Sequence, residues 1–261
     1  MEVIIVPTPT DVGRVAAAKI ADVVARRASP VIGFATGSSP QHLYADLHRR
    51  VEAGVISFAT ARGFALDEYA GIPPAHPQSY ASVIARDVVS PLGFDPARVH
   101  VPDGRATDLR GAAADYEAAI DAAGGIDIQI LGIGSNGHIG FNEPTSSLAS
   151  RTRIKTLAQR TREDNARFFD SPADVPRHCI TQGLGTILDA RELLLVAQGE
   201  AKADAIAATV EGPLGAMVPG TALQLHPHAT VVVDEAAASK LRLSDYYRYT
   251  YSHKPAWQRF E

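Results

Sequence analysis

Short runs of consecutive apolar residues alternate along this chain with longer stretches in which apolar residues recur every three or four positions. The first pattern predicts strands buried on both faces of a sheet, and the second predicts amphipathic helices. Strands are predicted over residues 3–6, 30–35, 63–66, 98–101, 126–131, 193–196 and 229–233. Helices are predicted over 11–27, from Pro40 onward, over 79–89, 108–123 and 201–210, and as a short start at 236–239.

This alternation predicts an α/β protein with a three-layer Rossmann-like fold, in which a mostly parallel sheet carries helices on both faces. Asp11 is expected to cap the first helix, and Pro40 to begin the second at a position that proline favours. No internal repeat or linker interrupts the pattern, so we expect a single domain over residues 1–261. With 46% hydrophobic residues, a chain of this length can bury a substantial core.

Two segments depart from the alternation. Residues 146–182 lack a clear strand pattern and are rich in arginine, and we predict that their later part, about 156–182, is a lid over a functional site. The tail at about 244–261 contains the aromatic and basic run Tyr246 to Tyr251. Three fates remain open for this tail: it packs on the domain, forms an interface, or stays disordered.

The loop that follows the strand at 126–131 is the most informative feature of the chain. Its residues 132–144 include four glycines, His138 and Glu143. Ligands of open α/β sheets bind beyond the carboxyl ends of the strands, which is where this loop begins. An imidazole and a carboxylate in one turning loop suit proton transfer near neutral pH. The alternative interpretation is a tight turn with a histidine and a glutamate on the surface.

Two further loops carry candidate chemistry. Thr36, Gly37 and Ser38 follow the second strand and precede a helix, so backbone N–H groups, hydroxyls and the helix dipole could hold a phosphate. An ordinary helix cap explains them equally well. Asp67 and Glu68 end the third strand, where the side chains of adjacent residues diverge, so one could face a cleft. A solvated loop is the commoner outcome, and no second carboxylate cluster supports a Mg²⁺ site.

Composition excludes several classes of function. The net charge of −4 and the pI of about 6.1 give no reason to expect nucleic acid or an anionic membrane as a partner. The first residues resemble a strand rather than a signal peptide, and no apolar stretch approaches the length of a membrane span. We therefore expect a cytoplasmic protein. The single cysteine, Cys179, excludes an intrachain disulfide and any metal cluster of several cysteines.

Taken together, the motifs resemble the glucosamine-6-phosphate deaminase family. The matching stretches keep the family's order and cover nearly the whole chain except the tail. They are residues 35–40, 66–69, 76–80, 132–144, 146–157, 165–169 and 223–227. Each stretch alone is weak evidence, whereas the combination is highly specific.

The resemblance implies a reversible isomerisation and deamination of glucosamine 6-phosphate to fructose 6-phosphate and ammonia, in amino-sugar catabolism and without a metal or organic cofactor. It implies that His138 moves a proton between O1 and O5 to open the sugar ring, assisted and oriented by Asn136 and Glu143. It also implies that Asp67 takes the C2 proton and returns it at C1. Both tasks suit the chemistry of these side chains, since an imidazole exchanges protons near pH 7 and a fixed carboxylate can act as a base.

The same resemblance implies that the 6-phosphate rests on Thr36, Gly37 and Ser38, with Arg167 and Lys202 as cations. The chain also departs from the family, because asparagine stands at position 136 where some members have aspartate. An amide can orient His138 but adds no negative charge. The pKa of His138 is therefore expected to be raised less than it would be beside two carboxylates.

Ser146, Ser147, Arg153 and Lys155 match the stretch that binds an activating sugar phosphate in allosteric, hexameric members of the family. The resemblance thus implies a homo-oligomer, a hexamer, whose substrate affinity rises with N-acetylglucosamine 6-phosphate. The alternative is that these residues form only a surface or interface patch. The tail does not align cleanly with the tyrosine that allosteric members place near this site.

Rival functions are distinguished by particular residues. The 6-phosphogluconolactonases share the general architecture but need no isomerase base, so the loop of Asp67 argues against them. An isomerase that acts on sugar phosphates without deamination is a second rival. Sugar-phosphate-sensing regulators carry a fused helix-turn-helix, for which we expect no room before Met1 or after the last strand. A binding protein without activity would be expected to lack Asp67 or His138.

Overall fold

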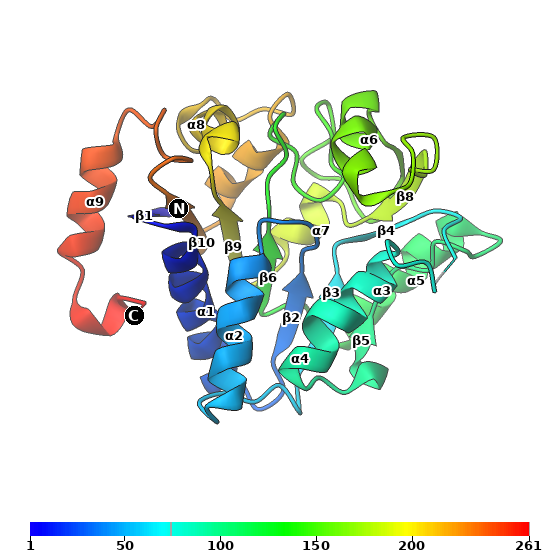
Figure 1. Cartoon of the computed structure of the whole chain (residues 1–261), viewed down its shortest axis with the longest axis horizontal. Coiled ribbons are helices and arrows are strands. Elements are labelled where there is room, and N and C mark those ends of the chain that lie inside the picture. Colours follow the sequence, from blue (N-terminus) through cyan, green and yellow to red (C-terminus); the bar gives the residue numbers. More distant parts are fainter. Residues whose placement is uncertain (74, 261) are drawn as a thin grey trace.

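The computed structural model describes residues 1–73 and 75–260, in which seven parallel strands form the central sheet (Figure 1). Their order across the sheet is β1-β10-β9-β6-β2-β3-β5. The strands are β1 (Glu2–Val6), β2 (Val31–Phe34), β3 (Arg62–Ala65), β5 (Val99–His100), β6 (Ile128–Leu131), β9 (Glu192–Ala197) and β10 (Ala229–Asp234). Every strand predicted from an apolar run is confirmed, with its ends shifted by two residues or fewer.

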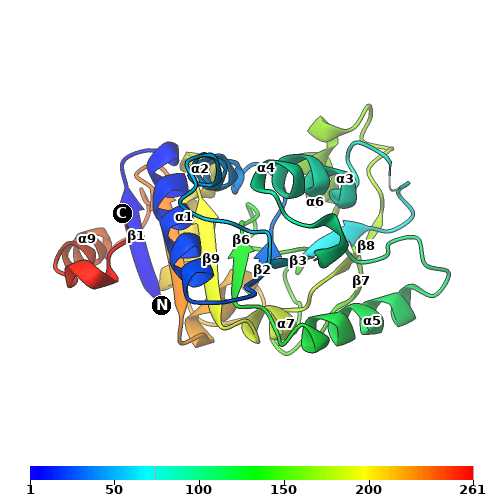
Figure 2. The same cartoon turned by 90° about the horizontal axis from the view of Figure 1, so that it is seen from below.

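Helices cover both faces of the sheet, which explains why β2, β6 and β10 are buried along their whole length. Figure 2 shows α2, α3 and α4 on one side of the sheet and α5 and α7 on the other. The helices are α1 (Pro9–Ala25), α2 (Gln41–Glu52), α3 (Tyr80–Ile84), α4 (Ser90–Leu92), α5 (Leu109–Ala122), α6 (Gln159–Asn165), α7 (Leu184–Leu188), α8 (Ala203–Glu211) and α9 (Ser244–Ser252). The predicted three-layer α/β fold is confirmed.

The strand order reverses between β2 and β6. After β2 the chain continues outward through β3 and β5, whereas after β6 it continues through β9 and β10 toward the opposite edge. The loops that follow β2 and β6 therefore start side by side and diverge. In open parallel sheets such a reversal leaves a crevice in which ligands bind.

A second, antiparallel sheet lies beside the first and was not predicted. It has the order β4-β8-β7 and consists of β4 (Asp67–Tyr69), β8 (His178–Thr181) and β7 (Arg153–Thr156). The expectation that residues 146–182 lack a strand was wrong. The strand β7 alternates half-buried Arg153 and Lys155 with exposed Ile154 and Thr156, so it has no apolar run to reveal it.

Three smaller expectations need correction. Thr8, not Asp11, caps α1: its hydroxyl oxygen accepts a hydrogen bond from the backbone N–H of Asp11 at 3.2 Å. Pro40 stands at the cap of α2, one residue before the helix begins at Gln41. The short helix expected at 236–239 is a series of turns, because backbone N–H groups there bond to Asp234 instead of forming a helical ladder.

The tail packs on the domain over the part that the structure describes, while Glu261 lies outside the described residues. Helix α9 lies beside β1 at the edge of the large sheet, so the first strand and the last helix are neighbours there (Figure 1). The ammonium group of Lys254 pairs with the carboxylate of Glu2 at 2.5 Å. None of the helices in residues 1–73 and 75–260 combines the length and apolar character needed to cross a bilayer.

Candidate active site

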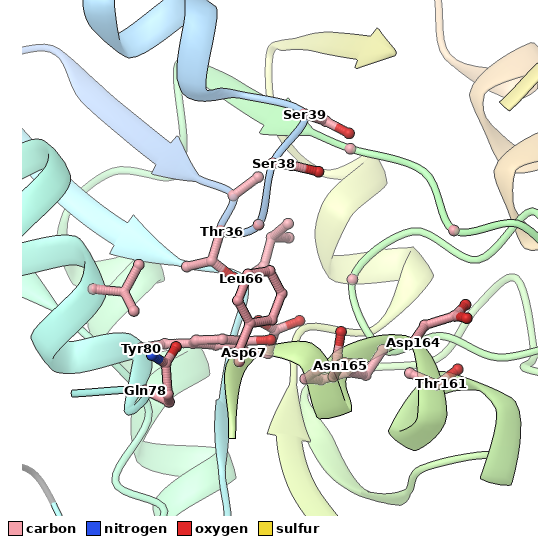
Figure 3. Close-up of a pocket in the computed structure, with 18 of the residues that line it drawn as sticks. Thr36, Ser38, Ser39, Leu66, Asp67, Gln78, Tyr80, Thr161, Asp164 and Asn165 are labelled. Carbon is pink, nitrogen blue, oxygen red and sulfur yellow. The ribbon is translucent and has the colours of Figure 1, made fainter. Parts of the chain in front are cut away.

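A cavity of about 280 Å³ lies where the loops after β2 and β6 diverge. Thr36 and Ser38 line one side, Thr161, Asp164 and Asn165 approach from α6, and Asp67 lies between the two groups (Figure 3). The site therefore occupies the crevice that the strand order creates. Segments that are distant in the sequence meet here because parallel strands end at the same edge of the sheet.

The loop after β2 forms one wall. Thr36, Gly37 and Ser38 all line the cavity, and Gly37 has a φ of +89°, which is a conformation that glycine adopts without strain. Helix α2 begins directly beyond, and its cap, Pro40, has no side chain that could satisfy the first N–H groups. A helix start without a side-chain cap and the positive end of the helix dipole favour an anion at this wall.

Two cations line the same cavity. Lys202 ends a 3₁₀ turn (Glu200–Lys202) before α8, and its ammonium group donates a hydrogen bond to the carbonyl of Ile133 at 2.8 Å. Burial lowers the pKa of Lys202, with a smaller opposing effect from Asp164. Arg167 is exposed in the turn after α6. The structure thus brings together the whole set of residues predicted to hold the phosphate.

The glycine-rich loop after β6 places His138 in the cavity. Its turn requires glycine at position 134, because a Cβ atom there would come within 2.1 Å of the imidazole ring. The ring nitrogen Nδ1 lies 2.7 Å from the side-chain oxygen of Asn136. That oxygen is an acceptor, so Nδ1 carries the proton of the neutral ring and Nε2 is the basic atom.

Asn136 and Glu143 lie behind His138 and do not line the cavity. The amide nitrogen of Asn136 donates to Glu143 Oε2 at 2.8 Å, and the same oxygen lies 3.6 Å from His138 Nδ1. Burial lowers the pKa of His138, and the charge of Glu143 opposes this effect without cancelling it. The expected small rise in this pKa is therefore replaced by a decrease, because the predominant effect is desolvation.

Asp67 is 5% exposed and lines the cavity beside the glycine-rich loop of residues 132–144. Burial, and secondarily the charge of Glu68, raise its pKa from 3.8 to about 8, while hydrogen bonds from Thr181 and the backbone of Phe141 act against the rise. The loop approaches closely at Gly140, where an added Cβ would lie 3.6 Å from Asp67 Oδ2. Once ionised, a carboxylate with such a raised pKa readily accepts a proton from a bound molecule.

Glu68 points away from the cavity, as the divergence of adjacent strand residues predicted. Its carboxylate accepts backbone N–H groups from Tyr69, Tyr80 and Ala81 at 2.8 to 2.9 Å, and so it caps the start of α3. This fixes β4 against α3 and brings Tyr80 to the cavity wall. Of the two acids, only Asp67 is available for chemistry.

Helix α6 contributes side chains that the sequence reasoning missed. Thr161 donates to Glu143 Oε1, Asp164 accepts from the hydroxyl of Ser135 at 3.4 Å, and Asn165 donates to the hydroxyl of Tyr69 at 3.0 Å. The three α6 residues are spaced by three and four positions and so share one face of the helix. That polar spacing was the signal available in the sequence, where it is masked by the many arginines of the same segment.

The four residues predicted to bind an effector do not line the cavity. Arg153 and Lys155 lie two positions apart in β7, so their side chains lie on the same face of the small sheet. Ser146 is buried, and its backbone N–H bonds to the carbonyl of Glu143 at 3.0 Å, while Ser147 is exposed. Within the described residues there is no group of three or more histidine, cysteine, aspartate or glutamate side chains that could hold a metal ion.

The chain is similar in sequence to proteins of one known family. Residues 9–233 match the model of a family described as glucosamine-6-phosphate isomerases/6-phosphogluconolactonase. Proteins named glucosamine-6-phosphate deaminase from Streptomyces coelicolor and Mycolicibacterium smegmatis are 56% and 57% identical to the chain over 259 residues, with 99% of each chain covered.

Solved structures of similar proteins agree with this family match. A structure described as a monomeric glucosamine-6-phosphate deaminase superposes with a TM-score of 0.90 at 39% identity, covering 92% of this chain and 100% of that one. The 6-phosphogluconolactonase from Trypanosoma cruzi reaches a TM-score of 0.73 at 21% identity, covering 92% and 97%, and shows the shared fold alone.

Proposed function

The chain belongs to the family of glucosamine-6-phosphate isomerases and 6-phosphogluconolactonases, and we propose that it is the deaminase of glucosamine 6-phosphate. The reaction converts glucosamine 6-phosphate and water reversibly into fructose 6-phosphate and ammonia, a step of amino-sugar catabolism. One observation carries the proposal: buried Asp67 and half-buried His138 line a single cavity whose other wall suits a phosphate. A lactonase needs no carbon base, whereas an isomerase does.

The phosphate wall fixes the position of the sugar. Thr36, Gly37 and Ser38 offer hydroxyl and backbone donors, and Lys202 and Arg167 offer charge-assisted hydrogen bonds to the phosphate oxygens. A sugar anchored by its 6-phosphate reaches from this wall toward His138 and Asp67. When the sugar is held in place relative to the proton-transfer groups, the reaction no longer has to bear the entropic cost of bringing these groups together from solution.

Ring opening is the task of His138. Because Nδ1 holds its proton against Asn136, Nε2 is free to take a proton from the hydroxyl at O1 and return it to O5. The decreased pKa favours the neutral ring, which is the form whose Nε2 can accept a proton. Glu143 stabilises the imidazolium that forms in the course of the transfer, since its carboxylate lies 3.6 Å from Nδ1.

Isomerisation and deamination follow on the open chain. Asp67 removes the proton from C2 and returns it to C1, which moves the carbonyl character from C1 to C2. The nitrogen at C2 is then an imine, which adds water and releases ammonia to leave the ketone of fructose 6-phosphate. The burial of Asp67 strengthens it as a base, because a carboxylate with a raised pKa accepts a proton more readily than an exposed one.

The test uses purified wild-type protein with glucosamine 6-phosphate, and it measures ammonia and fructose 6-phosphate together. We expect equal amounts of both products, with no dependence on added metal. A matched assay with 6-phosphogluconolactone should show no hydrolysis above the spontaneous rate. Isomerised amino sugar without ammonia, or hydrolysis of the lactone, would contradict the proposal.

We further propose that the chain forms a hexamer activated by N-acetylglucosamine 6-phosphate through Ser146, Ser147, Arg153 and Lys155. Two cations on one face of β7 suit a phosphate, and the segment that bears them follows Glu143 closely in the chain. The 39% identical solved structure is described as monomeric, so the oligomeric state of this chain needs its own measurement.

Sedimentation and effector titration test this second proposal. We expect a hexamer whose apparent substrate affinity rises with the effector. The double variant Arg153→Ala, Lys155→Ala should lose that response and keep its basal turnover. A monomer in sedimentation, or hyperbolic kinetics that do not change with the effector, would exclude this second proposal.

We place the reaction in the cytoplasm, because doubly charged sugar phosphates do not pass through a bilayer unaided.

A further inference from the structure

We propose that Thr161 is a positioning residue for the acid–base group: its hydroxyl holds Glu143, and through Asn136 it orients His138. The inference rests on the proposed function, since it assigns a residue to the ring-opening step of that reaction. Thr161 lies on α6, outside the loop that carries the other members of this chain of contacts. Ring opening would therefore depend on how α6 packs against the glycine-rich loop of residues 132–144.

The hydroxyl of Thr161 is placed with little freedom. The residue is 3% exposed, and its Oγ1 donates to Glu143 Oε1. A β-branched side chain in a helix has few rotamers, so the backbone position of α6 largely decides where this hydroxyl points. Thr161 also lines the cavity, so its hydroxyl is held at the site itself.

The carboxylate of Glu143 is held at both of its oxygens. In the described part of the chain, its hydrogen bonds come from Thr161 at Oε1 and from the amide of Asn136 at Oε2. Asn136 then uses its oxygen to accept from His138 Nδ1 at 2.7 Å and from the backbone N–H of His138 at 3.2 Å. Each contact fixes the next, so the threonine hydroxyl is the first member of a chain that ends at the imidazole.

Without the hydroxyl, a buried carboxylate oxygen would lack a donor. Glu143 is 7% exposed, so water reaches it poorly, and an ionised oxygen without a partner is costly at such a site. The carboxylate would rotate away from its present position. This change weakens the stabilisation of the imidazolium of His138 and leaves the phosphate wall untouched.

The docking of α6 is reinforced by its neighbours on the same face. Asp164 contacts Ser135 of the glycine-rich loop, and Asn165 contacts Tyr69 of β4. The turn that follows α6 carries Arg167 at the phosphate end of the cavity. The short helix α6 and the turn after it thus link the phosphate end of the site to Glu143.

The experiment compares Thr161→Val, which keeps the shape and removes the donor, with Thr161→Ser, which keeps the donor. For cyclic glucosamine 6-phosphate we expect the valine variant to lose about 10- to 100-fold in kcat with little change in KM, and the serine variant to stay within about threefold of wild type. For a 5-deoxy analogue, which cannot close a pyranose ring, both variants should match wild type.

A second background isolates the route through Glu143. In Glu143→Ala, adding Thr161→Val should cost nothing more, because the hydroxyl has lost the group it holds. Multiplied losses, equal losses on both substrates, or a valine variant as active as wild type would overturn the inference. Thermal unfolding of each variant serves as the folding control, and Thr161→Ala repeats the comparison if the valine variant is unfolded. Failure of the proposed function looks different, since wild type itself would then release no ammonia.

Discussion

The replacement Asp67→Asn should separate the stability of the protein from its activity. Asp67 is 5% exposed, and its burial raises its pKa from 3.8 to about 8. The amide is close to the carboxylate in shape and cannot ionise. It therefore removes both the proposed base and a buried group that resists losing its proton, while leaving the packing of β4 almost unchanged.

The sign of the effect on stability follows from the raised pKa. Between pH 3.8 and about pH 8 the unfolded chain has lost the proton of Asp67 while the folded chain retains it. Folding therefore takes up a proton, and the stability that the neutral carboxyl contributes is complete below this window and is lost as pH rises through it. The slope approaches about 1.4 kcal/mol per pH unit within the window.

The measurement is urea unfolding of wild type and Asp67→Asn at several pH values, at fixed ionic strength and protein concentration. The other titrating groups are common to both proteins, so their effects cancel in the difference. We expect the variant to gain about 3 to 4 kcal/mol in unfolding free energy relative to wild type between about pH 5 and pH 8. Activity should move the opposite way, with kcat lower by about 10²- to 10⁴-fold at pH 8.

A difference in unfolding free energy that stays constant with pH would refute the reasoning. It would mean that Asp67 titrates near its ordinary pKa and that burial does not control it. Normal turnover in the variant would refute the assignment of the base independently of the stability result. For wild type, the same raised pKa predicts that kcat/KM increases with pH up to about 8, and this limb should be absent from the residual activity of the variant.

Three further outcomes follow from the site. His138→Gln should reduce turnover of cyclic glucosamine 6-phosphate more than turnover of an open-chain analogue, and equal losses would move His138 to a later step. Lys202→Ala and Arg167→Ala should each weaken discrimination between glucosamine 6-phosphate and glucosamine by about 1.5–3 kcal/mol, measured as the ratio of kcat/KM values. Asn136→Asp should raise the pKa of His138, followed by NMR titration of the ring, since it adds a charge beside Glu143; an unchanged pKa would show that Asn136 does not face the imidazole.

The sequence by itself determined the order and type of nearly all the elements of the large sheet. Its strands are runs of apolar residues, and its helices repeat at the helical period, and both signals are local. The loop positions followed from the same signals, because the carboxyl ends of parallel strands meet at one edge. That is why Asp67, His138 and Thr36 could be assigned to one site before any contact was known.

Only the tertiary structure determined the second sheet, the contacts of Glu143 and the pKa shifts of the site, because none of these depends on the local sequence pattern alone. Strand β8 pairs with the edge of β4, and β7 pairs in turn with β8, so the two strands depend on a partner that is distant in the sequence. The half-exposed residues of β7 carry no apolar run. One partner of Glu143, Thr161, comes from helix α6 and not from the loop that carries Glu143, so the relay from Thr161 to His138 exists only after α6 docks. The pKa values of Asp67 and His138 likewise depend on burial, which is a property of the packed chain and not of the residues nearby in sequence.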